Sequence, residues 1–524
     1  FSPGVATGHC LHNKIASTVT IAAAPDASCE IWHVKLQNMS ANDRTLSFTT
    51  YVRPRSGSAL ECKYLKKNRA LVMRRPLDVL ESDRTGKMAD DLVYFHSSTL
   101  IPTRYETEKS NFIGEGRTLS NPQYFEEDRH DECGGTADSP IVSFTVEVEL
   151  PIEGEAEFGF CFGAAHNVDD AVDTARKFAT VDSINQAISA SRGAWKELTS
   201  ALKVETQDRA FDALVNTWLP YESAAEWVRE HAGNPHLDPY RAADALRCLM
   251  PISSTAPELL RDSLLNFASR LSVLGAYCPN GESQVTLPPV ELLWLVVCSA
   301  KYVAETRDNS ILSHVVPLQD GLCLTLKEHC ERALRTCLYD GHSIEQERDQ
   351  RLLERALKLW SYVSEDSDEF DGRLADIAGR QLPDRPDYAE QRSLPRPVKY
   401  FQSISPSLAH KDIAENLEIY LSPNGKPRAE TSTACYVYSV LVEQTIGLTA
   451  TSEGLILKPN LPESWHECTV TTQFRGDTYH IHIKRSSKPT KKGMSVIVDG
   501  EPVLGEMLPF VGDGAEHGVE ITVG

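Results

Sequence analysis

The stretch NVDDAVDTARKFATVDSINQAISASRGAWKELTSAL (residues 167–202) divides the chain into two kinds of sequence. Its apolar residues recur at helical spacing, with acidic residues early and basic residues late, as the two ends of a helix prefer. Before this stretch apolar and polar residues alternate in short runs, whereas helical spacing continues after it to about residue 450. We therefore predict a helical linker over 167–203 that joins a β domain to a helical domain.

Five runs in the first part of the chain have the alternating pattern of β-strands. They are STVTIAAA (17–24), CEIWHVKLQNMS (29–40), RTLSFTTYVRP (44–54), IVSFTVEVELP (141–151) and AEFGFCFGAA (156–165). Turn-forming residues separate them, which favours an antiparallel β-sandwich over 1–166. We expect the polar piece from 105 to 138 to be a long loop.

The middle of the chain carries the apolar spacing of amphipathic helices. Examples are PELLRDSLLNFASRLSVLG (257–275) and VELLWLVVCSAKYVAET (290–306). Short alternating runs such as CTVTTQFRG (468–476) return after residue 450. The predicted fold is multidomain α+β: the sandwich, the linker, a helical domain over 204–450 and a small C-terminal β domain over 451–524.

Charge and composition exclude several classes of partner. The 524 residues carry a formal net charge of −21, whereas nucleic acids and anionic membranes require basic surfaces. No run of 18 apolar residues occurs, so we expect no membrane span. The sequence begins at Phe1 without a basic region followed by an apolar run, and we expect no signal peptide. A neutral or polar small molecule suits this charge as substrate.

The thirteen cysteines are scattered, odd in number and partly placed inside apolar helical runs. This usage predicts free thiols and a cytoplasmic location. Cys323, Cys330 and Cys337 repeat every seven residues on one predicted helix face, with His329 beside them. Thiols one heptad apart cannot converge on one ion, because zinc ligands lie about 2.3 Å from the metal. We expect no metal site.

Four longer segments resemble glycoside hydrolase family 94, which contains cellobiose and chitobiose phosphorylases and a module of cyclic β-1,2-glucan synthases. They are APDASCEIWHVKLQNMSANDRTLSFTTYV (24–52), GAWKELTSALKVETQDRAFDALVNTWLPYESAAEWVR (193–229), VELLWLVVCSAKYVAETRDNSILSHVVPLQDG (290–321) and GLTATSEGLILKPNLPESWHECTVTTQFRGDTYHIHIKR (447–485). The resemblance implies a β-sandwich, an (α/α)6 toroid, whole or reduced, and a C-terminal β domain. It also implies a homodimer.

The chemistry that the resemblance implies is inverting phosphorolysis of β-linked gluco-oligosaccharides, with hydrolysis as the variant that uses water. One carboxylic acid protonates the glycosidic oxygen while inorganic phosphate attacks from the other face. Phosphate would be a co-substrate, and no other cofactor is expected. Because the nucleophile is already an anion, the protein needs one acid and a group of donors that hold the phosphate.

At the acid position this sequence departs from the family. The family usually has two adjacent aspartates before LLW, where this chain has Val290 and Glu291. Val290 cannot replace the first of these, the general acid, so Glu291 is the catalytic candidate that the resemblance offers. The alternative is that Glu291 is an acid in the first turn of a helix that begins after Pro288 and Pro289, where the helix dipole favours it.

A second departure concerns substrate binding. LDPYRAADALRCL (237–249) is similar to the family's sugar-binding segment, in which Arg241 is retained and the following aspartate has become Ala242. Asp244 lies one helical turn beyond Arg241 and can share its face, as a sugar ligand or as a surface ion pair. With Trp294, these two residues are the candidates for substrate binding.

A third segment, NGKPRAETSTACYVY (424–438), is similar to the family's glycine-rich phosphate loop, although most glycines are replaced. Thr431, Ser432 and Thr433 are the phosphate-binding candidates, because hydroxyl and N–H groups at a helix start bind oxyanions. The same residues would also serve as a plain helix cap. His410 stands one position from where the family has a phosphate-contacting histidine.

Three functions remain open. The chain is a phosphorylase or hydrolase, a catalytically silent protein that binds glycans or acts as a scaffold, or a toroid used for chemistry on an apolar non-sugar substrate. The missing acid at Val290 weighs against the first, and the retained Arg241 weighs against the second. The apolar segment VELLWLVV (290–297) suits the third but also suits ordinary core packing.

Overall fold

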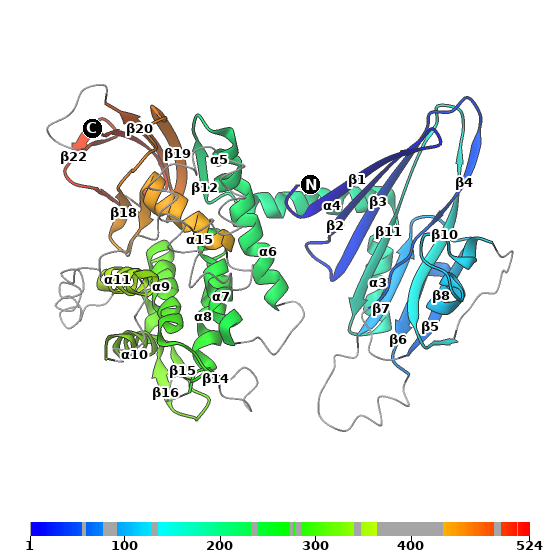
Figure 1. The fold of residues 1–524 in the computed structure, drawn as a ribbon, viewed down its shortest axis with the longest axis horizontal. Helices are drawn as coiled ribbons and strands as arrows, with labels where there is room; N and C mark the ends of the chain where they lie inside the picture. The colour runs from blue at the N-terminus through cyan, green and yellow to red at the C-terminus, as the bar shows by residue number, and fades with distance from the viewer. Residues whose placement is uncertain are drawn as a thin grey trace, which may run out of the picture. The chain divides into compact units, whose positions relative to one another are not determined.

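The structure, a computed structural model, divides into two compact units, Phe1–Lys196 and Glu197–Gly524 (Figure 1). It describes residues 2–54, 59–76, 92–126, 135–231, 239–272, 276–277, 285–339, 347–363, 433–486, 494–510 and 512–523. Each unit has a β-sheet and helices of its own, so the two are described in turn.

The first unit contains an eight-stranded antiparallel sheet and a three-stranded one. The large sheet has the order β1-β2-β3-β11-β7-β6-β5-β9, and the small sheet has the order β4-β10-β8. The strands are β1 (Val5–His12), β2 (Ile15–Ala23), β3 (Cys29–Asn38), β4 (Arg44–Thr49), β5 (Leu60–Leu65), β6 (Ala70–Arg74), β7 (Val93–Ser98), β8 (Arg104–Glu108), β9 (Gly135–Ala137), β10 (Pro140–Leu150) and β11 (Glu155–Ala165). The short helices are η1 (Lys66–Asn68), α2 (Lys109–Ile113) and η2 (Gln123–Phe125).

Both faces of the large sheet are covered, because successive side chains of a strand point to opposite sides. On β6, Leu71 and Met73 join the core shared with the small sheet. Ala70 and Val72 join a second core with helices α3 (Val168–Lys177) and α4 (Val181–Leu198). These contacts form the predicted β-sandwich, with helices on its outer face.

The close approach of α4 to the sheet depends on a glycine. A Cβ added at Gly159 on β11 would lie 2.4 Å from Cδ1 of Ile184 and 2.5 Å from the carbonyl oxygen of Trp32. Neither position leaves room for a methyl group. Gly159 therefore sets the distance at which α4 packs on β11.

His96 on β7 is fully buried in the sandwich core. Its ring stacks on Phe144 and Phe160, with centroid distances of 4.9 and 5.6 Å. Nδ1 lies 3.1 Å from the carbonyl oxygen of Cys161, and Nε2 lies 3.0 Å from the hydroxyl of Thr50. Burial lowers the pKa of His96 to about 4, although the Cys161 carbonyl opposes the shift. The histidine is neutral at physiological pH.

The helices of the second unit pack around α9 (Pro289–Thr306). Fourteen of the eighteen residues of α9 are buried, which is the state of a helix that is apolar on all sides. It packs against α7, α8, α10 and α11. The helices of this part are α5 (Arg209–Ala213), the π-helix η3 (Leu214–Trp218), α6 (Leu219–His231), α7 (Pro239–Cys248), η4 (Met250–Ile252), α8 (Pro257–Ser269), η5 (Asn309–Ser313), α10 (Leu326–Tyr339), α11 (Glu347–Ser361), α15 (Thr433–Ser439) and the π-helix η7 (Val440–Ile446).

The second unit also contains two larger sheets. A six-stranded sheet has the order β12-β19-β20-β24-β21-β22, and a three-stranded sheet has the order β17-β18-β23. Their strands are β12 (Leu202–Glu205), β17 (Leu448–Ala450), β18 (Gly454–Leu457), β19 (Glu467–Phe474), β20 (Asp477–Arg485), β21 (Met494–Val498), β22 (Glu501–Val503), β23 (Met507–Pro509) and β24 (Glu516–Val523). Two small hairpins pair β13 (Ala276–Tyr277) with β14 (Val285–Thr286), and β15 (Val315–Pro317) with β16 (Cys323–Thr325).

Some sequence expectations change with the structure. The polar piece 105–138 is not simply a loop, because it contains α2 and β9. Helix α11 is rich in charged residues but amphipathic, and Trp360 on it is fully buried. The eleven cysteines of the described ranges are free thiols. Among the helices that the structure describes, none has the length and apolarity that crossing a membrane requires.

Candidate functional site

The candidate site begins at the first turn of α9. Pro288 precedes the helix and Pro289 opens it, and the N–H of Glu291 donates to the carbonyl of Pro288 at 2.9 Å. Proline suits this position because the first N–H groups of a helix have no partner within it. The first turn carries Glu291 into the protein interior, where the residue is 3% exposed.

Arg247, near the end of α7, meets Glu291 there. The guanidinium Nη1 lies 3.4 Å from Oε2 of Glu291, and Arg247 is 6% exposed. The guanidinium also contacts the carboxylate of Asp244, one turn earlier on α7, and donates to the hydroxyl of Tyr436 on α15. Three helices that are far apart in the sequence thus meet at one buried cation.

Two aromatic rings complete this ion cluster, which consists of Asp244, Arg247, Glu291, Trp294 and Tyr436. The carbon at the centre of the guanidinium lies 5.1 Å from the ring centroids of both Trp294 and Tyr436. The two rings contact each other edge to face at 5.7 Å. Aromatic faces attract a cation most strongly where water is excluded, as it is here.

The electrostatics of the cluster follow from its burial. Desolvation disfavours the charged guanidinium, but Tyr436 and Glu291 outweigh it and raise the pKa of Arg247. The arginine is therefore a fixed positive charge. Two carboxylates, Glu291 and Asp244, contact this one cation.

The structure brings some predicted site residues together and leaves others outside its described part. Glu291, Asp244 and Trp294 all belong to the ion cluster. Arg241 lies in α7, but its side chain is outside the described residues, so its pairing with Asp244 stays a prediction.

The predicted phosphate-binding residues lie mostly outside the description. His410, Thr431 and Ser432 are outside the described ranges, and Thr433 is described only as the first residue of α15. The same helix brings Tyr436 to Arg247, so the segment expected to bind phosphate ends beside the candidate acid.

Sequence reasoning missed Arg247 and Tyr436. A signal for Arg247 exists, since it is the single charge in ALRCLM (245–250) and follows Asp244 by three residues. Such a charge within an apolar run needs a partner, and the i, i+3 spacing supplies one. Nothing comparable marks Tyr436, because its partner is 189 positions away.

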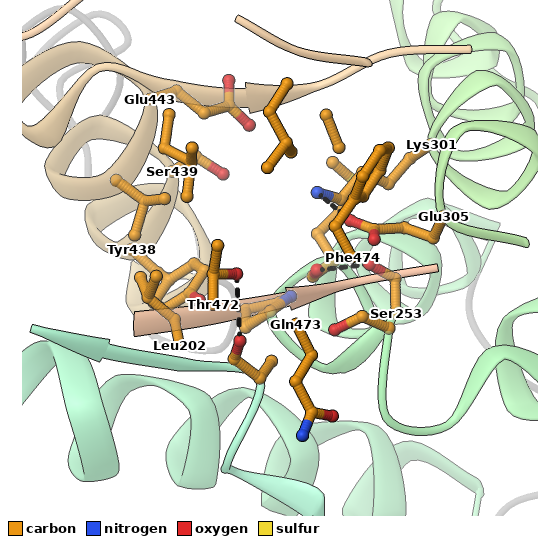
Figure 2. A pocket seen from close by; sticks show the side chains of 18 residues that line it. Leu202, Ser253, Lys301, Glu305, Tyr438, Ser439, Glu443, Thr472, Gln473 and Phe474 are labelled. Carbon is orange, nitrogen blue, oxygen red and sulfur yellow. Dashed lines mark hydrogen bonds and ion pairs between the residues drawn. The ribbon is translucent and has the colours of Figure 1, made fainter. Parts of the chain in front are cut away.

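A pocket lies elsewhere in the second unit, where the C-terminal half of α9 meets η7 and the sheet strand β19. It encloses about 590 Å³ of space, part of which is open to solvent. Figure 2 shows Lys301 and Glu305 on one wall and Tyr438 and Glu443 on the other. Lys301 pairs with Glu305 at 2.7 Å, and Glu443 pairs with Arg355 at 2.6 Å. The charges in this pocket already have partners, so the ion cluster is the stronger candidate for chemistry.

Comparison with known families identifies both parts of the chain. Residues 1–181 match the model of the glycosyl hydrolase 94 supersandwich domain. Residues 194–345 match that of the glycosyl hydrolase 94 superfamily catalytic domain. The second match includes α7 and α9, on which Asp244, Arg247, Glu291 and Trp294 lie.

Individual relatives agree with the family models. The chain is 25% identical over 321 residues to a cellobionic acid phosphorylase of Neurospora crassa, covering 58% of this chain and 39% of the relative. It is 23% identical over 368 residues to an N,N'-diacetylchitobiose phosphorylase of Vibrio proteolyticus, covering 62% of this chain and 45% of the relative. The chain thus spans less than half of the length of either relative.

A solved structure shares the fold. It is provisionally named a kojibiose phosphorylase from human microbiome, with a TM-score of 0.54 and 9% identity, over 97% of this chain and 83% of that one. The two family models, which together span most of residues 1–345, and the two phosphorylase relatives agree. The chain therefore belongs to glycosyl hydrolase family 94, as a divergent member.

Proposed function

We propose that this chain acts on oligosaccharides by phosphorolysis. Two similar curated proteins are named as phosphorylases of cellobionic acid and of N,N'-diacetylchitobiose. The finer proposal is an inverting reaction on β-linked gluco-oligosaccharides. In it the glycosidic C–O bond breaks, the proton goes to the leaving oxygen, and a C–O bond to phosphate forms on the opposite face.

The ion cluster is the observation that carries this proposal. Burying a carboxylate is costly unless it has a partner, and Glu291 contacts the guanidinium of Arg247, which Asp244 also contacts. In the proposed reaction Glu291 carries the proton to the glycosidic oxygen and returns as a carboxylate paired with Arg247.

Other parts of the proposal follow the family. Arg241, Asp244 and Trp294 would contact the sugar, and Thr431, Ser432, Thr433 and His410 would hold the phosphate. We propose that the helices of 204–450 form an (α/α) toroid, with 167–203 as linker and 451–524 as a C-terminal β domain. We also propose that the chain forms a homodimer and acts in the cytoplasm. Inorganic phosphate would be its co-substrate, with no other cofactor.

A second candidate is a member that binds glycans without turning them over. The observation that favours it is the apolar Val290 at the usual acid position, next to a Glu291 that already contacts Arg247 at 3.4 Å. If that ion pair is permanent, no proton donor faces the sugar. Both candidate functions predict that the chain binds oligosaccharides, and only the phosphorylase predicts that it converts them to product.

The deciding experiment offers the chain a panel of β-linked disaccharides with inorganic phosphate and measures sugar 1-phosphate by phosphorus NMR. Phosphorolysis predicts a sugar 1-phosphate that forms only when phosphate is present. Saturable binding of the same disaccharides by calorimetry, without any product, would refute the enzyme and favour the glycan-binding protein. Free sugar formed without phosphate would instead indicate hydrolysis.

A further inference from the structure

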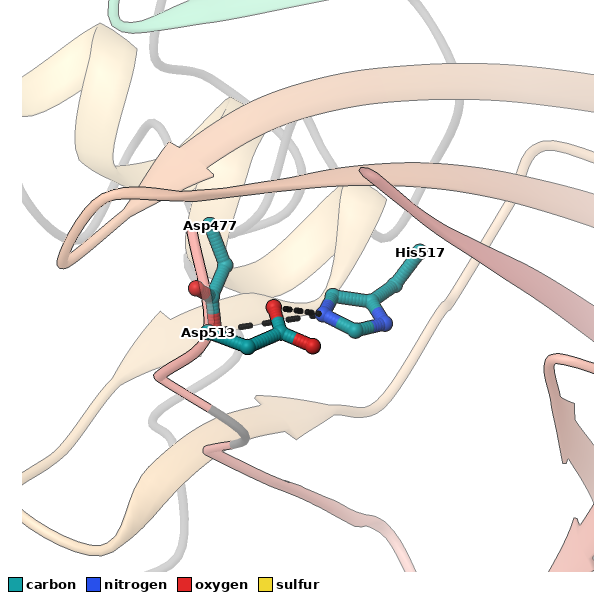
Figure 3. A group of neighbouring side chains, drawn as sticks. All are labelled: Asp477, Asp513 and His517. Atoms are coloured by element: carbon teal, nitrogen blue, oxygen red, sulfur yellow. Dashed lines mark hydrogen bonds and ion pairs between the residues drawn. The ribbon is translucent and has the colours of Figure 1, made fainter. Parts of the chain in front are cut away.

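A group of metal-ligating side chains lies in the six-stranded sheet of the second unit, outside the ion cluster. Asp477 begins β20, His517 lies on β24 beside it, and Asp513 belongs to the turn before β24. One potential ligand atom from each residue lies within 4.8 Å of the other two. Figure 3 shows both carboxylates on the same side of the imidazole, facing one ring nitrogen.

The histidine is oriented as a metal ligand would be. Its Nδ1 lies 2.8 Å from Oδ2 of Asp499, in the turn between β21 and β22. That contact leaves Nε2 directed at Asp513, 3.3 Å away, and at Asp477, 4.0 Å away. A carboxylate on one ring nitrogen and an ion on the other is the usual arrangement of metal-bound histidines.

Hydrogen bonds hold the buried carboxylate of Asp477 in place. Asp477 is fully buried; its Oδ2 accepts from the N–H of Gly512 at 2.7 Å and from the hydroxyl of Tyr479 at 3.4 Å, and its Oδ1 accepts from the N–H of Gly514 at 2.9 Å. Both glycines have positive φ, 74° and 72°, which lets the loop turn its N–H groups inward. The contact with Tyr479 is long, so a cation that binds Oδ2 would displace only this weak hydrogen bond.

The charge around the histidine favours a cation. Asp477, Asp499 and Asp513 all face His517, and in the described part of the chain no lysine or arginine forms an ion pair with any of the three. Even with a protonated imidazole, the three carboxylates leave this group of four side chains with a net negative charge. A bound divalent cation would neutralise that charge.

We propose that Asp477, Asp513 and His517 form a site for a divalent cation of the zinc type, with Asp499 as the residue that positions the imidazole. Ligand atoms of a tetrahedral zinc ion lie about 3.4 Å apart, because each bond is close to 2.1 Å. The 3.3 Å between Nε2 and Asp513 fits this geometry, and Asp477, 4.0 Å from Nε2, must approach by about 0.6 Å. Imidazole selects zinc over magnesium or calcium.

The site would act as a structural cross-link. It joins the start of β20 to the turn before β24, and through Asp499 it reaches the β21–β22 hairpin. No ligand spacing in the sequence marks it, because the three ligands are 36 and 4 positions apart on different elements. The proposal is independent of the glycoside chemistry.

The test uses the full-length chain, freed of metal with a chelator, and titrates it with zinc chloride by calorimetry and thermal unfolding. Asp513 is half exposed, so Asp513→Asn removes a ligand without disturbing the core. Asp262→Asn, an exposed acid on α8, is the matched control. Free thiols elsewhere in the chain are potential zinc ligands, but Asp513→Asn leaves them intact, so the difference between the variants isolates this site.

We expect zinc to raise the unfolding temperature of the original chain and of Asp262→Asn. Asp513→Asn should lose that rise, and Asp499→Asn should bind zinc about 10- to 100-fold more weakly, the usual effect of losing an orienting partner. Magnesium should have no effect. Equal zinc affinity in the original chain and Asp513→Asn, or no effect of zinc on unfolding, would overturn the proposal and leave an ordinary ion-pair network.

Discussion

Each of the two units buries a basic side chain, and they do so in opposite ways. In the first unit His96 is neutral, with a carbonyl and a hydroxyl as partners and two aromatic rings stacked on its imidazole. In the second unit Arg247 is charged, with two carboxylates, a phenol and two aromatic rings around it. Both are buried, so burial alone does not decide the charge.

The difference lies in the partners. Neutral partners do not offset the free-energy cost of removing a cation from water, so burial keeps His96 unprotonated. Carboxylates offset this cost, so Arg247 keeps its charge and contacts two acids. The sandwich buries a neutral polar group, whereas the helical part gathers carboxylates around a buried cation.

The largest expected effect comes from removing the cation. Arg247→Met should destabilise the second unit by about 3–5 kcal/mol, because the buried Glu291 and the partly buried Asp244 lose this cation. Urea unfolding of the full-length chain measures the loss. Arg335→Met, which removes a half-exposed partner of Glu331, should cost less than about 1 kcal/mol.

A double variant sharpens this prediction. Arg247→Met together with Glu291→Met replaces an ion pair by apolar side chains, so it should recover part of the stability that Arg247→Met loses. If Arg247→Met alone unfolds like the original chain, the guanidinium is not the counter-ion of the cluster, and the comparison between the units fails.

The second effect concerns the neutral histidine. His96 has a pKa of about 4 in the folded chain and 6.5 in the unfolded chain, so the unfolded chain takes up a proton first as the pH falls. The contribution of the neutral His96 to the free energy of unfolding is fully present above pH 6.5. About 3 kcal/mol of it is lost as the pH falls from 6.5 to about 4. Urea unfolding at pH 7 and pH 4 measures this loss.

His96→Phe is the variant that isolates this titration, because phenylalanine keeps a ring between Phe144 and Phe160. The variant should lose less stability between pH 7 and pH 4 than the original chain does. An equal loss of stability in both chains would mean that His96 is not the titrating group. His96 would then not be held in its neutral form by burial in the sandwich.

A smaller effect is expected from removing the hydroxyl of Tyr436 while keeping its ring. Tyr436→Phe removes the hydroxyl that accepts from Arg247 and keeps the ring, so it should cost about 2 kcal/mol, typical of a hydrogen bond to a charged group. Tyr438→Phe, two residues later on the same helix, is the control and should cost less. Equal losses would show that the contact with Arg247 adds nothing.

The fold was predictable from the sequence where patterns are local. β2, β3, β4, β10 and β11 all alternate clearly and appear within a few residues of the predicted ranges. β5, β6 and β7 were missed, because LECKYL (60–65), ALVMR (70–74) and VYFHSS (93–98) are short and mostly apolar or mixed, without a regular alternation. β12 was missed because its partner β19 lies far along the chain.

The site was predictable only in part, for a similar reason. Glu291 and Trp294 were found because family positions mark them, and Asp244 was found because it lies one helical turn beyond Arg241. Arg247 and Tyr436 give the cluster its charge and its third helix, but their contacts join residues up to 189 positions apart. Local spacing cannot report such contacts, and neither residue stands at a family position that the sequence comparison used.

The most direct test of the account is the turnover of Glu291→Gln. With a disaccharide that the original chain phosphorolyses, the account predicts about a 10²-fold loss of turnover, the scale of a lost acid catalyst, and a smaller loss with a nitrophenyl glycoside that leaves without protonation. Glu305→Gln changes an acid on the same helix, paired with Lys301, and should keep its turnover. Unchanged turnover of Glu291→Gln on both substrates would contradict the account and leave Glu291 as the counter-ion of Arg247 alone.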